Sequence, residues 1–337
     1  MKVISLKDDT HLQDCYAATI GFFDGVHLGH RYVLQQLRQE AERHGWPSMA
    51  ITFDRHPRQV VDTSWHPQLL TTLDEKVTLL QQTGIDILTV LTFNETMAQL
   101  SAHDFMLHVL KEQLGVRLLL TGYDNRFGHR TAGSHEGFND YVRYGRELNI
   151  DVVCAKELQP SSSAMPPSSS QEPSTSCFHV SSSQIRRLLC GGRVNEAAQC
   201  LGRCYSLKGT VEHGFQQGRA MGFPTANIHV DPSRLVPADG VYAVRVGLSP
   251  TLQPFTGITN IGMRPTFNGH QRTIETHIFD FEGDIYGTDI EISFAARLRD
   301  EQHFQSADEL AQQMAHDAEA ARRFFSTTNG TKIIDLK

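Results

Sequence analysis

The chain has 337 residues, of which 39% are hydrophobic and 20% are charged. This length suffices for two domains that each bury a core, and the composition suits a soluble globular protein. The formal net charge is -7 and no run of Lys or Arg occurs, which argues against a general nucleic-acid surface. No stretch of about 18 apolar residues predicts a membrane span.

Six cysteines are scattered along the chain rather than grouped in a framework; they stand at positions 15, 154, 177, 190, 200 and 204. No second pair follows the closest pair, Cys200 and Cys204, at the spacing of a zinc site. We therefore expect free thiols in a reducing compartment. The N-terminus lacks the apolar region of a signal peptide, so a cytoplasmic protein with small-molecule substrates, and no nucleic-acid or membrane partner, is expected.

The first predicted elements are a strand, a glycine-rich loop and a helix. Ala17–Ile20 is typical of a short buried strand, and apolar residues at helical spacing predict a helix over Arg31–Ala41, closed by Gly45. Residues 21–30 between them read Gly-Phe-Phe-Asp-Gly-Val-His-Leu-Gly-His. Such a loop lets the backbone approach a ligand, and it leads into a helix N-terminus, which favours anions.

Two histidines of this loop, His27 and His30, stand three residues apart, so both rings can face one bound group. They could ligate a metal, although no third ligand lies at suitable spacing, or they could be ordinary residues at a helix start. We favour donation of hydrogen bonds to phosphate oxygens of a nucleoside triphosphate, where charge develops as it is attacked.

The four residues His-Leu-Gly-His resemble the H-x-G-H loop of the nucleotidyltransferase superfamily. The ten-residue context resembles the adenylyltransferase half of bifunctional riboflavin kinase/FAD synthetases. The resemblance implies that FMN attacks the α-phosphorus of ATP and releases pyrophosphate. It makes His27 and His30 catalytic, and it implies that these residues bind ATP together with Gly21, Phe22 and Gly25. Phe22 stands where this family frequently has asparagine.

Strands and helices then alternate, which predicts a parallel sheet and an α/β Rossmann-like nucleotidyltransferase domain. The expected strands are Met49–Phe53, Ile85–Phe93, Val116–Thr121 and Ile150–Ala155. Three helices are expected. The first begins at the capping-box pair Thr72 and Glu75, the second is started by Ser101 and Asp104, and the third covers Phe138–Leu148. Asp54–Pro57 forms a polar turn at the carboxyl edge of the sheet, where such sheets bind ligands.

A second stretch of this half, Gly122–Gly128, matches the G-x-D-x-x-F-G segment of the same family. By that resemblance Asp124 and Gly128 bind ATP, and Asp124 helps to place the nucleotide or a metal. Arg55 stands where the family often has proline before His-Pro, and residues 129–136 look like a local insertion.

Residues 160–176 contain eight serines and four prolines. Such a segment buries too little apolar surface to offset its ordering entropy, so we expect a disordered insertion. A regulatory or glycosylated tract is the alternative to a tolerated surface insertion. Ser181–Arg186 then predicts a helix start and resembles the family's Ser-Ser-Thr-x-Ile-Arg loop, with Ser183 where threonine is usual. The resemblance implies that Ser182, Ser183 and Arg186 contact ATP. The alternative is an ordinary N-cap followed by a solvated Arg.

From Tyr205 onward, short apolar alternations punctuated by Gly and Pro predict a small antiparallel β-barrel domain. They cover Tyr205–Val211, Val241–Val246, Phe255–Ile261, Thr273–Phe281 and Asp289–Ala295. A short helix over Val194–Leu201 precedes them, and a C-terminal amphipathic helix over Asp308–Phe325 follows.

The barrel half contains Gly218-Arg219-Ala220-Met221-Gly222-Phe223-Pro224-Thr225-Ala226-Asn227. A glycine-rich loop can wrap a phosphate chain, although glycines alone fit any tight turn. In an extended chain the side chains of Thr225 and Asn227 share one face, and their oxygens suit Mg²⁺.

This run closely resembles the G-R-x-x-G-F-P-T-A-N loop of riboflavin kinases, and Gly240–Tyr242, Asn260–Phe267 and Asp284–Gly287 match further segments of that family. The resemblance implies an ATP site formed by Gly209, Gly218, Arg219, Gly222, Thr225 and Asn227, with Thr225 and Asn227 as the metal ligands. It also makes Glu275 the general base for the 5′-hydroxyl of riboflavin. The alternative is an ordinary solvent-facing strand glutamate.

Together the resemblances imply that residues 1–190 adenylylate FMN to FAD and that residues 191–337 phosphorylate riboflavin to FMN with Mg²⁺ and ATP. Two alternatives stay open. One is a riboflavin kinase whose adenylyltransferase half is inactive, and the other is a non-catalytic flavin- or nucleotide-binding module.

Overall fold

The computed structural model describes residues 1–6, 11–62, 64–65, 67–122, 127–128, 136–158, 180–213, 222–248, 253–266 and 269–327. The expected insertion at 160–176 lies outside these residues. Contacts between Cα atoms divide the chain into two compact units, Met1–Ser181 and Ser182–Lys337. Each unit is described by itself. In the described residues no helix is long and apolar enough to cross a membrane.

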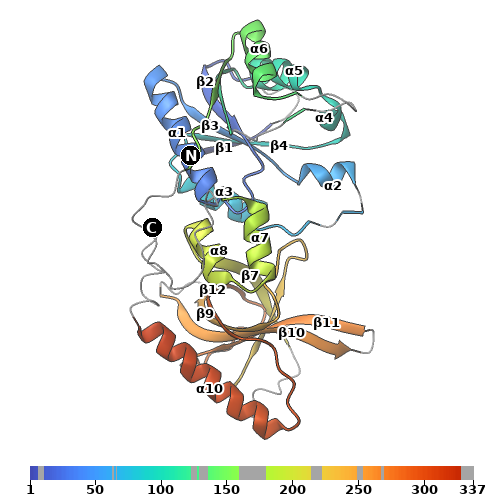
Figure 1. Cartoon of the computed structure of the whole chain (residues 1–337), viewed down its shortest axis with the longest axis vertical. Helices are drawn as coiled ribbons and strands as arrows, with labels where there is room; N and C mark the ends of the chain where they lie inside the picture. Colours follow the sequence, from blue (N-terminus) through green and yellow to red (C-terminus); the bar gives the residue numbers. More distant parts are fainter. Residues whose placement is uncertain are drawn as a thin grey trace, which may run out of the picture. The chain divides into compact units, whose positions relative to one another are not determined.

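The first unit is built on a six-stranded parallel sheet in the order β1-β4-β3-β2-β5-β6 (Figure 1). Its strands are β1 (Lys2–Ser5), β2 (Tyr16–Ile20), β3 (Ser48–Phe53), β4 (Ile87–Leu91), β5 (Val116–Thr121) and β6 (Asp151–Cys154). The helices are α1 (Leu28–His44), α2 (Pro57–Val61), α3 (Leu73–Gln81), α4 (Glu95–Gln99), α5 (Ala102–Asp104), the π-helical η1 (Phe105–Gln113) and α6 (Phe138–Leu148). The predicted Rossmann-like class is confirmed.

Alternate residues of β2 enter two different apolar cores, one on each face of the sheet. Ala17 packs in the core that contains Leu34 and Leu37 of α1. Ala18 belongs to the core that contains Phe105 of η1. A strand buried on both faces has no polar alternation, which is why β2 is continuously apolar in sequence. Each fully buried leucine of these cores stabilises the fold by about 2 kcal/mol.

The predicted helix ends are confirmed by capping geometry. Gly45 ends α1 with φ 66°, in the left-handed conformation that glycine tolerates. Thr72 and Glu75 form the expected capping box of α3, in which the Thr72 hydroxyl accepts from the Glu75 amide at 3.3 Å. The Ser101 hydroxyl accepts from the Asp104 amide at 3.0 Å and starts α5.

The second unit is a closed antiparallel barrel in the order β10-β11-β8-β7-β12-β9. Its strands are β7 (Tyr205–Glu212), β8 (Ala226–Val230), β9 (Gly240–Leu248), β10 (Phe255–Thr266), β11 (Gly269–Ile278) and β12 (Asp289–Arg299). Its helices are α7 (Ser182–Cys190), α8 (Val194–Leu201) and α10 (Ala307–Ser326). Because the Ala238 amide donates to the Leu189 carbonyl at 2.9 Å, the end of α7 is joined to this unit.

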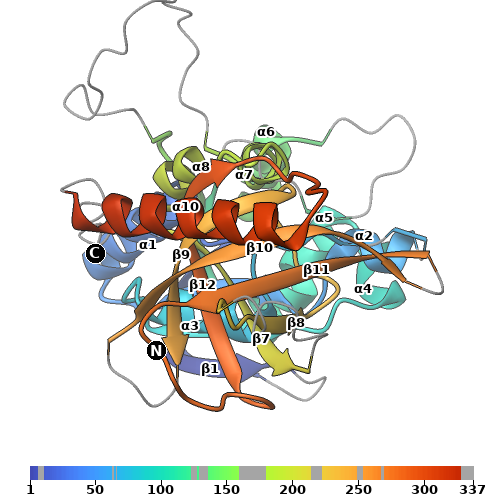
Figure 2. The same ribbon diagram turned by 90° about the horizontal axis from the view of Figure 1, so that it is seen from below.

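The predicted C-terminal helix is present as α10, and it lies across the barrel strands (Figure 2). Ala321 of α10 is fully buried and packs with Val241 and Ile258. An ion pair joins the helix to β12, since the Arg299 guanidinium donates to both oxygens of the buried Asp317 carboxylate at 2.8 to 3.1 Å. The paired geometry compensates the desolvation of that carboxylate.

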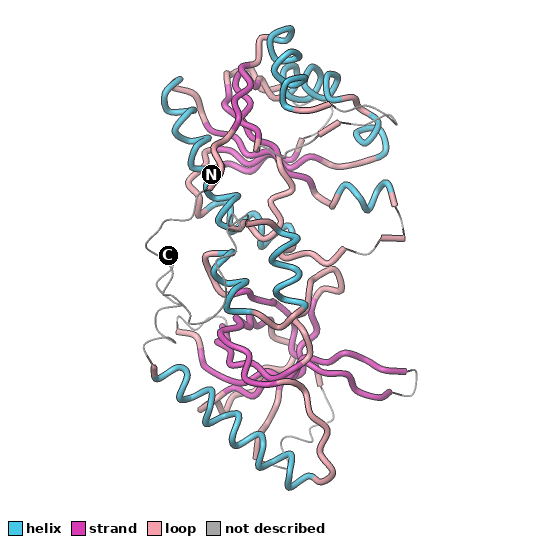
Figure 3. The backbone as a smooth tube through the Cα atoms, in the orientation of Figure 1, coloured by secondary structure: helices cyan, strands magenta, loops and turns pink. Residues whose placement is uncertain are grey.

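The hairpin of β10 and β11 is longer at its tip than the sequence predicts (Figure 3). Strand β10 continues through Pro265, where its pairing partner is β11 alone. Proline is tolerated there because an edge position requires no second ladder hydrogen bond. Strand β11 ends at Ile278 rather than Phe281, because Asp280 turns the chain with φ 57°.

Candidate active sites

The first candidate site lies at the carboxyl end of β2, in the middle of the parallel sheet. After β2 the chain passes through α1 to β3 on one side of β2, and β5 later occupies the other side. In an open parallel sheet such a change of direction leaves a crevice at the carboxyl ends, where ligands bind. The loop over residues 21–27 and the first turn of α1 follow β2 at this point (Figure 1).

This loop holds three residues in the left-handed region of backbone space. Gly25 has φ 79°, Phe23 has φ 52° and the β-branched Val26 has φ 38°. For residues other than glycine such a conformation costs about 1–3 kcal/mol each. The side chains of Phe23 and Val26 are 4% and 0% exposed, so their burial offsets the cost. Strained backbone of this kind is concentrated at binding sites.

A buried carboxylate ties the loop to a distant segment of the chain. Asp24, 3% exposed, accepts hydrogen bonds from the amides of Leu70 and Thr71 at 3.0 and 3.1 Å. The Thr71 hydroxyl in turn accepts from the Gly25 amide at 3.0 Å. Charge-assisted bonds of this type are the stronger class, so the loop shape is fixed before any ligand arrives.

The two histidines lie together, as their spacing predicts. Their rings stack with centroids 3.6 Å apart and planes 16° apart. His27 is the N-cap of α1, and its Nδ1 accepts from the His30 amide at 3.2 Å. A neutral ring that accepts at Nδ1 carries its hydrogen on Nε2. His27 therefore offers a donor from the helix N-terminus, where a phosphate oxygen is favoured.

His30 is kept in its neutral form. Burial, followed by the adjacent His27 ring and the Lys76 ammonium, holds the pKa of His30 well below its ordinary value. Its Nδ1 is buried and has no hydrogen-bond partner among the described residues. At neutral pH the ring is accordingly a hydrogen-bonding group rather than a cation.

The stability of the first unit is expected to fall as pH drops below about 6.5, the ordinary histidine pKa. Below that pH the unfolded chain binds a proton at His30 that the folded unit excludes, which is worth about 1.4 kcal/mol per pH unit down to the folded pKa. Calorimetry of the full chain at pH 7.5 and 5.5 measures this loss. His30→Asn should lose less stability on acidification, whereas His44→Asn, at an exposed position of the same helix, should match the original chain. An identical acid shift in His30→Asn contradicts the assignment.

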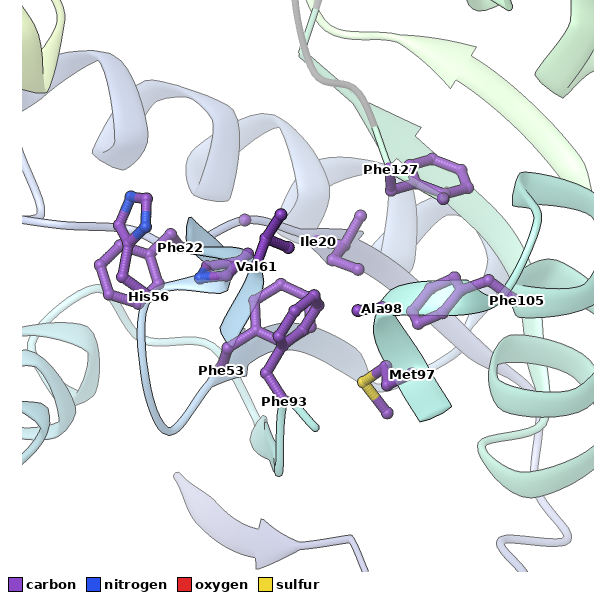
Figure 4. A pocket seen from close by; sticks show the side chains of 13 residues that line it. Ile20, Phe22, Phe53, His56, Val61, Phe93, Met97, Ala98, Phe105 and Phe127 are labelled. Atoms are coloured by element: carbon purple, nitrogen blue, oxygen red, sulfur yellow. The ribbon is translucent and has the colours of Figure 1, made fainter. Parts of the chain in front are cut away.

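An apolar cavity of about 490 Å³ adjoins the loop at the same edge of the sheet. Figure 4 shows its wall, which gathers side chains from the ends of β2 and β3, from α2 and α4, and from η1. The lining residues are Ile20, Gly21, Phe22, Phe53, His56, Pro57, Val61, Phe93, Met97, Ala98, Phe105, Phe127 and Gly128. Five phenylalanines make this a site for a flat apolar ring.

Sequence reasoning missed a buried lysine behind this wall. Lys76 of α3 is 2% exposed, and its Nζ lies 3.9 Å from the centroid of the Phe22 ring. Nζ also donates to the Thr52 hydroxyl at 3.3 Å and to the Phe53 carbonyl at 3.4 Å. The signal was present, because Lys76 shares the helical stripe of Leu73 and Leu80.

The remaining residues predicted for the first site lie in different places in the structure. Ser182, Ser183 and Arg186 lie in α7, within the second unit. The chain just before them lies close to the first turn of α1, since a Cβ at Gly29 would lie 3.3 Å from the Val180 carbonyl oxygen. Gly128 lines the cavity with φ 87°, and a Cβ there would lie 2.4 Å from the Ala102 nitrogen. Asp124 lies outside the described residues.

The second candidate site lies in the barrel, where Glu275 of β11 is paired with Asn227 of β8. The Glu275 side chain is 8% exposed, and one of its oxygens accepts from the Thr273 hydroxyl at 3.3 Å. Because Glu275 is buried, it is not the ordinary solvent-facing strand glutamate that the sequence analysis gave as the alternative. Asn227 lies in the extended strand β8, and Thr225 is the residue just before that strand begins.

A second carboxylate flanks the same asparagine. Glu212 of β7 is in register with Asn227 from the other side. Its side chain is 61% exposed and lies 3.9 Å from the His229 ring. A solvated carboxylate is less suited than a buried one to hold a fixed geometry. The described ranges hold no group of three His, Cys, Asp or Glu side chains that could bind a metal.

A cavity of about 550 Å³ opens beside Thr225. Its wall combines β8 and β11 with the turn after β11. The lining residues are Val211, Pro224, Thr225, Ala226, Thr276, Ile278, Phe281, Glu282, Gly283, Asp284, Ile285 and Tyr286. At its rim the Tyr286 ring stacks on His213 with centroids 3.8 Å apart. This wall includes the first three residues of the Asp284–Gly287 segment singled out in the sequence.

The glycines of this half have different local surroundings. A Cβ at Gly209 would lie 2.3 Å from the His229 carbonyl oxygen, so close strand packing alone requires glycine there. Gly222 has φ 81° and no atom within 4 Å of a Cβ, so its turn requires glycine for conformation. Gly218 and Arg219 lie outside the described residues.

Comparison with protein families divides the chain in the same way. Residues 9–169 match the FAD synthetase family, and residues 201–325 match the riboflavin kinase family. Among solved structures, one titled as a macrolide-efflux protein from Streptococcus pneumoniae superposes with a TM-score of 0.79 at 28% identity. It covers 96% of this chain and 99% of that one.

Curated relatives carry both domains in one chain. The bifunctional riboflavin kinase/FMN adenylyltransferase of Escherichia coli K12 is 35% identical over 317 residues, which cover 94% of this chain and 95% of the relative. The protein of the same description from Bacillus subtilis is 34% identical over 334 residues, with 97% and 99% covered. The chain therefore belongs to the bifunctional riboflavin kinase/FMN adenylyltransferase family.

Proposed function

We propose that the chain makes FMN from riboflavin and FAD from FMN, each time with ATP, and that the two reactions use the two sites separately. The adenylyltransferase domain is proposed to span residues 1–190 and the kinase domain residues 191–337. The observation that carries the proposal is that each unit holds its own reactive groups and its own cavity. The first unit has the stacked histidines and the aromatic cavity, and the second has the buried Glu275 and the cavity lined by Thr225.

In the first reaction a phosphate oxygen of FMN attacks the α-phosphorus of ATP. A new bond forms between that oxygen and phosphorus, the bond from the α-phosphorus to its bridging oxygen breaks, and pyrophosphate leaves. The nucleophile is already anionic, so no base is needed. His27 and His30 donate to the triphosphate where negative charge increases, supported by the N-terminus of α1.

The other ligands of this ATP are assigned by the family resemblance. They are Gly21, Phe22, Gly25, Asp124, Gly128, Ser182, Ser183 and Arg186, all of which fall within the proposed domain of residues 1–190. The aromatic cavity of the first unit receives the isoalloxazine ring of FMN, because its phenylalanine wall offers stacking and exclusion of water.

In the second reaction the 5′-hydroxyl oxygen of riboflavin attacks the γ-phosphorus of ATP. Glu275 accepts the hydroxyl proton as the new oxygen–phosphorus bond forms, and ADP leaves. Thr225 and Asn227 would hold Mg²⁺, which neutralises charge on the ATP phosphates when bound. The hydroxyl and amide oxygens of these two side chains are hard donors that fit that ion. Gly209, Gly218, Arg219 and Gly222 are proposed to shape the ATP site, with the nucleotide in the cavity beside Thr225.

The partners proposed are small molecules: riboflavin, FMN and ATP. We propose a cytoplasmic location, because the cysteines of the described residues, Cys15, Cys154, Cys190, Cys200 and Cys204, are free thiols.

The test is to incubate the full chain with riboflavin, ATP and Mg²⁺ and to separate the flavins by chromatography. We expect FMN to appear first and FAD to follow. FMN without FAD, also when FMN is supplied, would favour a kinase with an inactive adenylyltransferase half. No conversion of either flavin would favour a binding module.

A further inference from the structure

Among the buried groups to which neither proposed reaction assigns a role, the most unusual is the ammonium of Lys76. It belongs to α3 and does not line the aromatic cavity, yet it contacts two residues that do. Its Nζ lies 3.9 Å from the Phe22 ring centroid and 3.4 Å from the Phe53 carbonyl oxygen. A desolvated cation over an aromatic face is among the stronger cation–π contacts.

Lys76 also acts on the backbone of the same wall. Its Nζ donates to the hydroxyl of Thr52, which is fully buried on β3. That hydroxyl donates to the Phe22 carbonyl at 3.2 Å. Phe22 is thus held at its ring by the cation and at its carbonyl by a relay from the same cation. The Phe22 ring also contacts the His56 ring edge-on, with the ring centroids 4.7 Å apart. The orientation of the Phe22 ring is therefore fixed by both Lys76 and His56.

We propose that Lys76 is a positioning residue for FMN, and that its charged ammonium holds Phe22 in the orientation that receives the flavin ring. This inference rests on the proposed adenylyltransferase reaction and on the assignment of the aromatic cavity to FMN. A methionine or leucine would fill the same space without desolvating a charge, so packing alone does not call for lysine here.

The Lys76 ammonium loses its proton within a pH range close to physiological pH. Burial lowers the pKa of Lys76 to about 8, against the attraction of Asp24 in the loop and Asp54 after β3, which raise it. His30 also faces the ammonium, but it is neutral throughout this range. As pH rises through about 8 the amine loses its proton, and the cation–π contact is lost with it. FMN should then bind less tightly while the reacting groups are unchanged.

The experiment measures KM for FMN and kcat of FAD formation by the full chain, at saturating Mg-ATP, from pH 6.5 to 9. We expect KM to rise about tenfold as pH passes about 8, with kcat nearly constant, since one buried cation–π contact is lost. Lys76→Met should show the raised KM already at pH 7, with no further rise. Phe22→Leu should also show a raised KM without the pH step, which separates the effect from ionisation of the substrates.

Two further measurements separate positioning from mere packing. In Lys76→Met/Phe22→Leu the effects should not multiply, so that KM stays within about twofold of the single variants, because the lysine acts through the ring. Lys2→Met, at an exposed lysine of β1, should behave as the original chain. Circular dichroism and thermal melting of each variant report that the first unit is folded.

A KM for FMN that is constant with pH in the original chain overturns the inference, even if Lys76→Met does not fold. Multiplying effects in the double variant overturn it as well. If the original chain forms no FAD from supplied FMN, the proposed function itself fails. If it forms FAD and Lys76→Met retains the original KM at pH 7, the positioning role alone fails.

Discussion

Glu275→Gln is expected to lose riboflavin phosphorylation by a factor of about 10²–10⁴, the usual contribution of a general base. A primary alcohol is a poor nucleophile at neutral pH, and the amide cannot accept its proton. The substitution keeps the shape of the side chain and the bond from Thr273, so the barrel should fold as before. Initial rates of FMN formation from riboflavin measure the loss, and FAD formation from supplied FMN should continue.

Two matched variants make this test specific. Glu212→Gln removes the other carboxylate in register with Asn227, and we expect most kinase activity to remain because that side chain is solvated. Glu319→Gln lies at an exposed position of α10 and controls for the loss of one charge. Normal phosphorylation by Glu275→Gln, or a larger loss in Glu212→Gln, would show that the base is wrongly assigned.

His27→Ala and His30→Ala are each expected to lower FAD formation from supplied FMN by about 10²-fold, the effect of removing one donor to developing charge. Riboflavin phosphorylation should be unchanged, because Glu275 and its neighbours belong to the other unit. Given riboflavin and ATP, both variants should therefore accumulate FMN without FAD. The product ratio after chromatography is the measurement.

His27 also caps α1, and its loss alone could weaken the helix by about 1 kcal/mol. His27→Asn separates the two roles, since asparagine is a good N-cap but lacks the donor at the Nε2 position. It should be as inactive as His27→Ala while melting closer to the original chain. His44→Ala, at the exposed end of the same helix, should keep full activity. A parallel fall of FMN and FAD, with circular dichroism unchanged, would contradict two independent sites.

The elements with strong periodicity were predictable, and those held by distant contacts were not. Helix α1 and its end at Gly45 follow from local spacing and from the need for a left-handed residue. Strand β1 was missed because its four residues are mostly exposed and pair with β4 alone. The short helix α2 was expected as a polar turn, although Pro57 at its first position is a known start signal.

The same distinction applies to the sites. Motif spacing placed His27 beside His30 and Asn227 in an extended strand, because both relations are local. The aromatic cavity draws Phe53, Phe93 and Phe105 from the end of β3, the segment after β4 and the start of η1, and no spacing along the chain relates them. Lys76 was discernible from its helical stripe, but its contact with Phe22 depends on how α3 packs.

The hydrogen bonds of Asp24 have a consequence for the order of folding. They join residues 46 and 47 positions apart, so their formation requires closure of a long loop through β3. A peptide of residues 16–45 contains every residue of the phosphate motif, yet it lacks the amides of Leu70 and Thr71 that fix the loop. The nucleotide-binding shape is thus a non-local product of high contact order, which completes after the early helices and not with them.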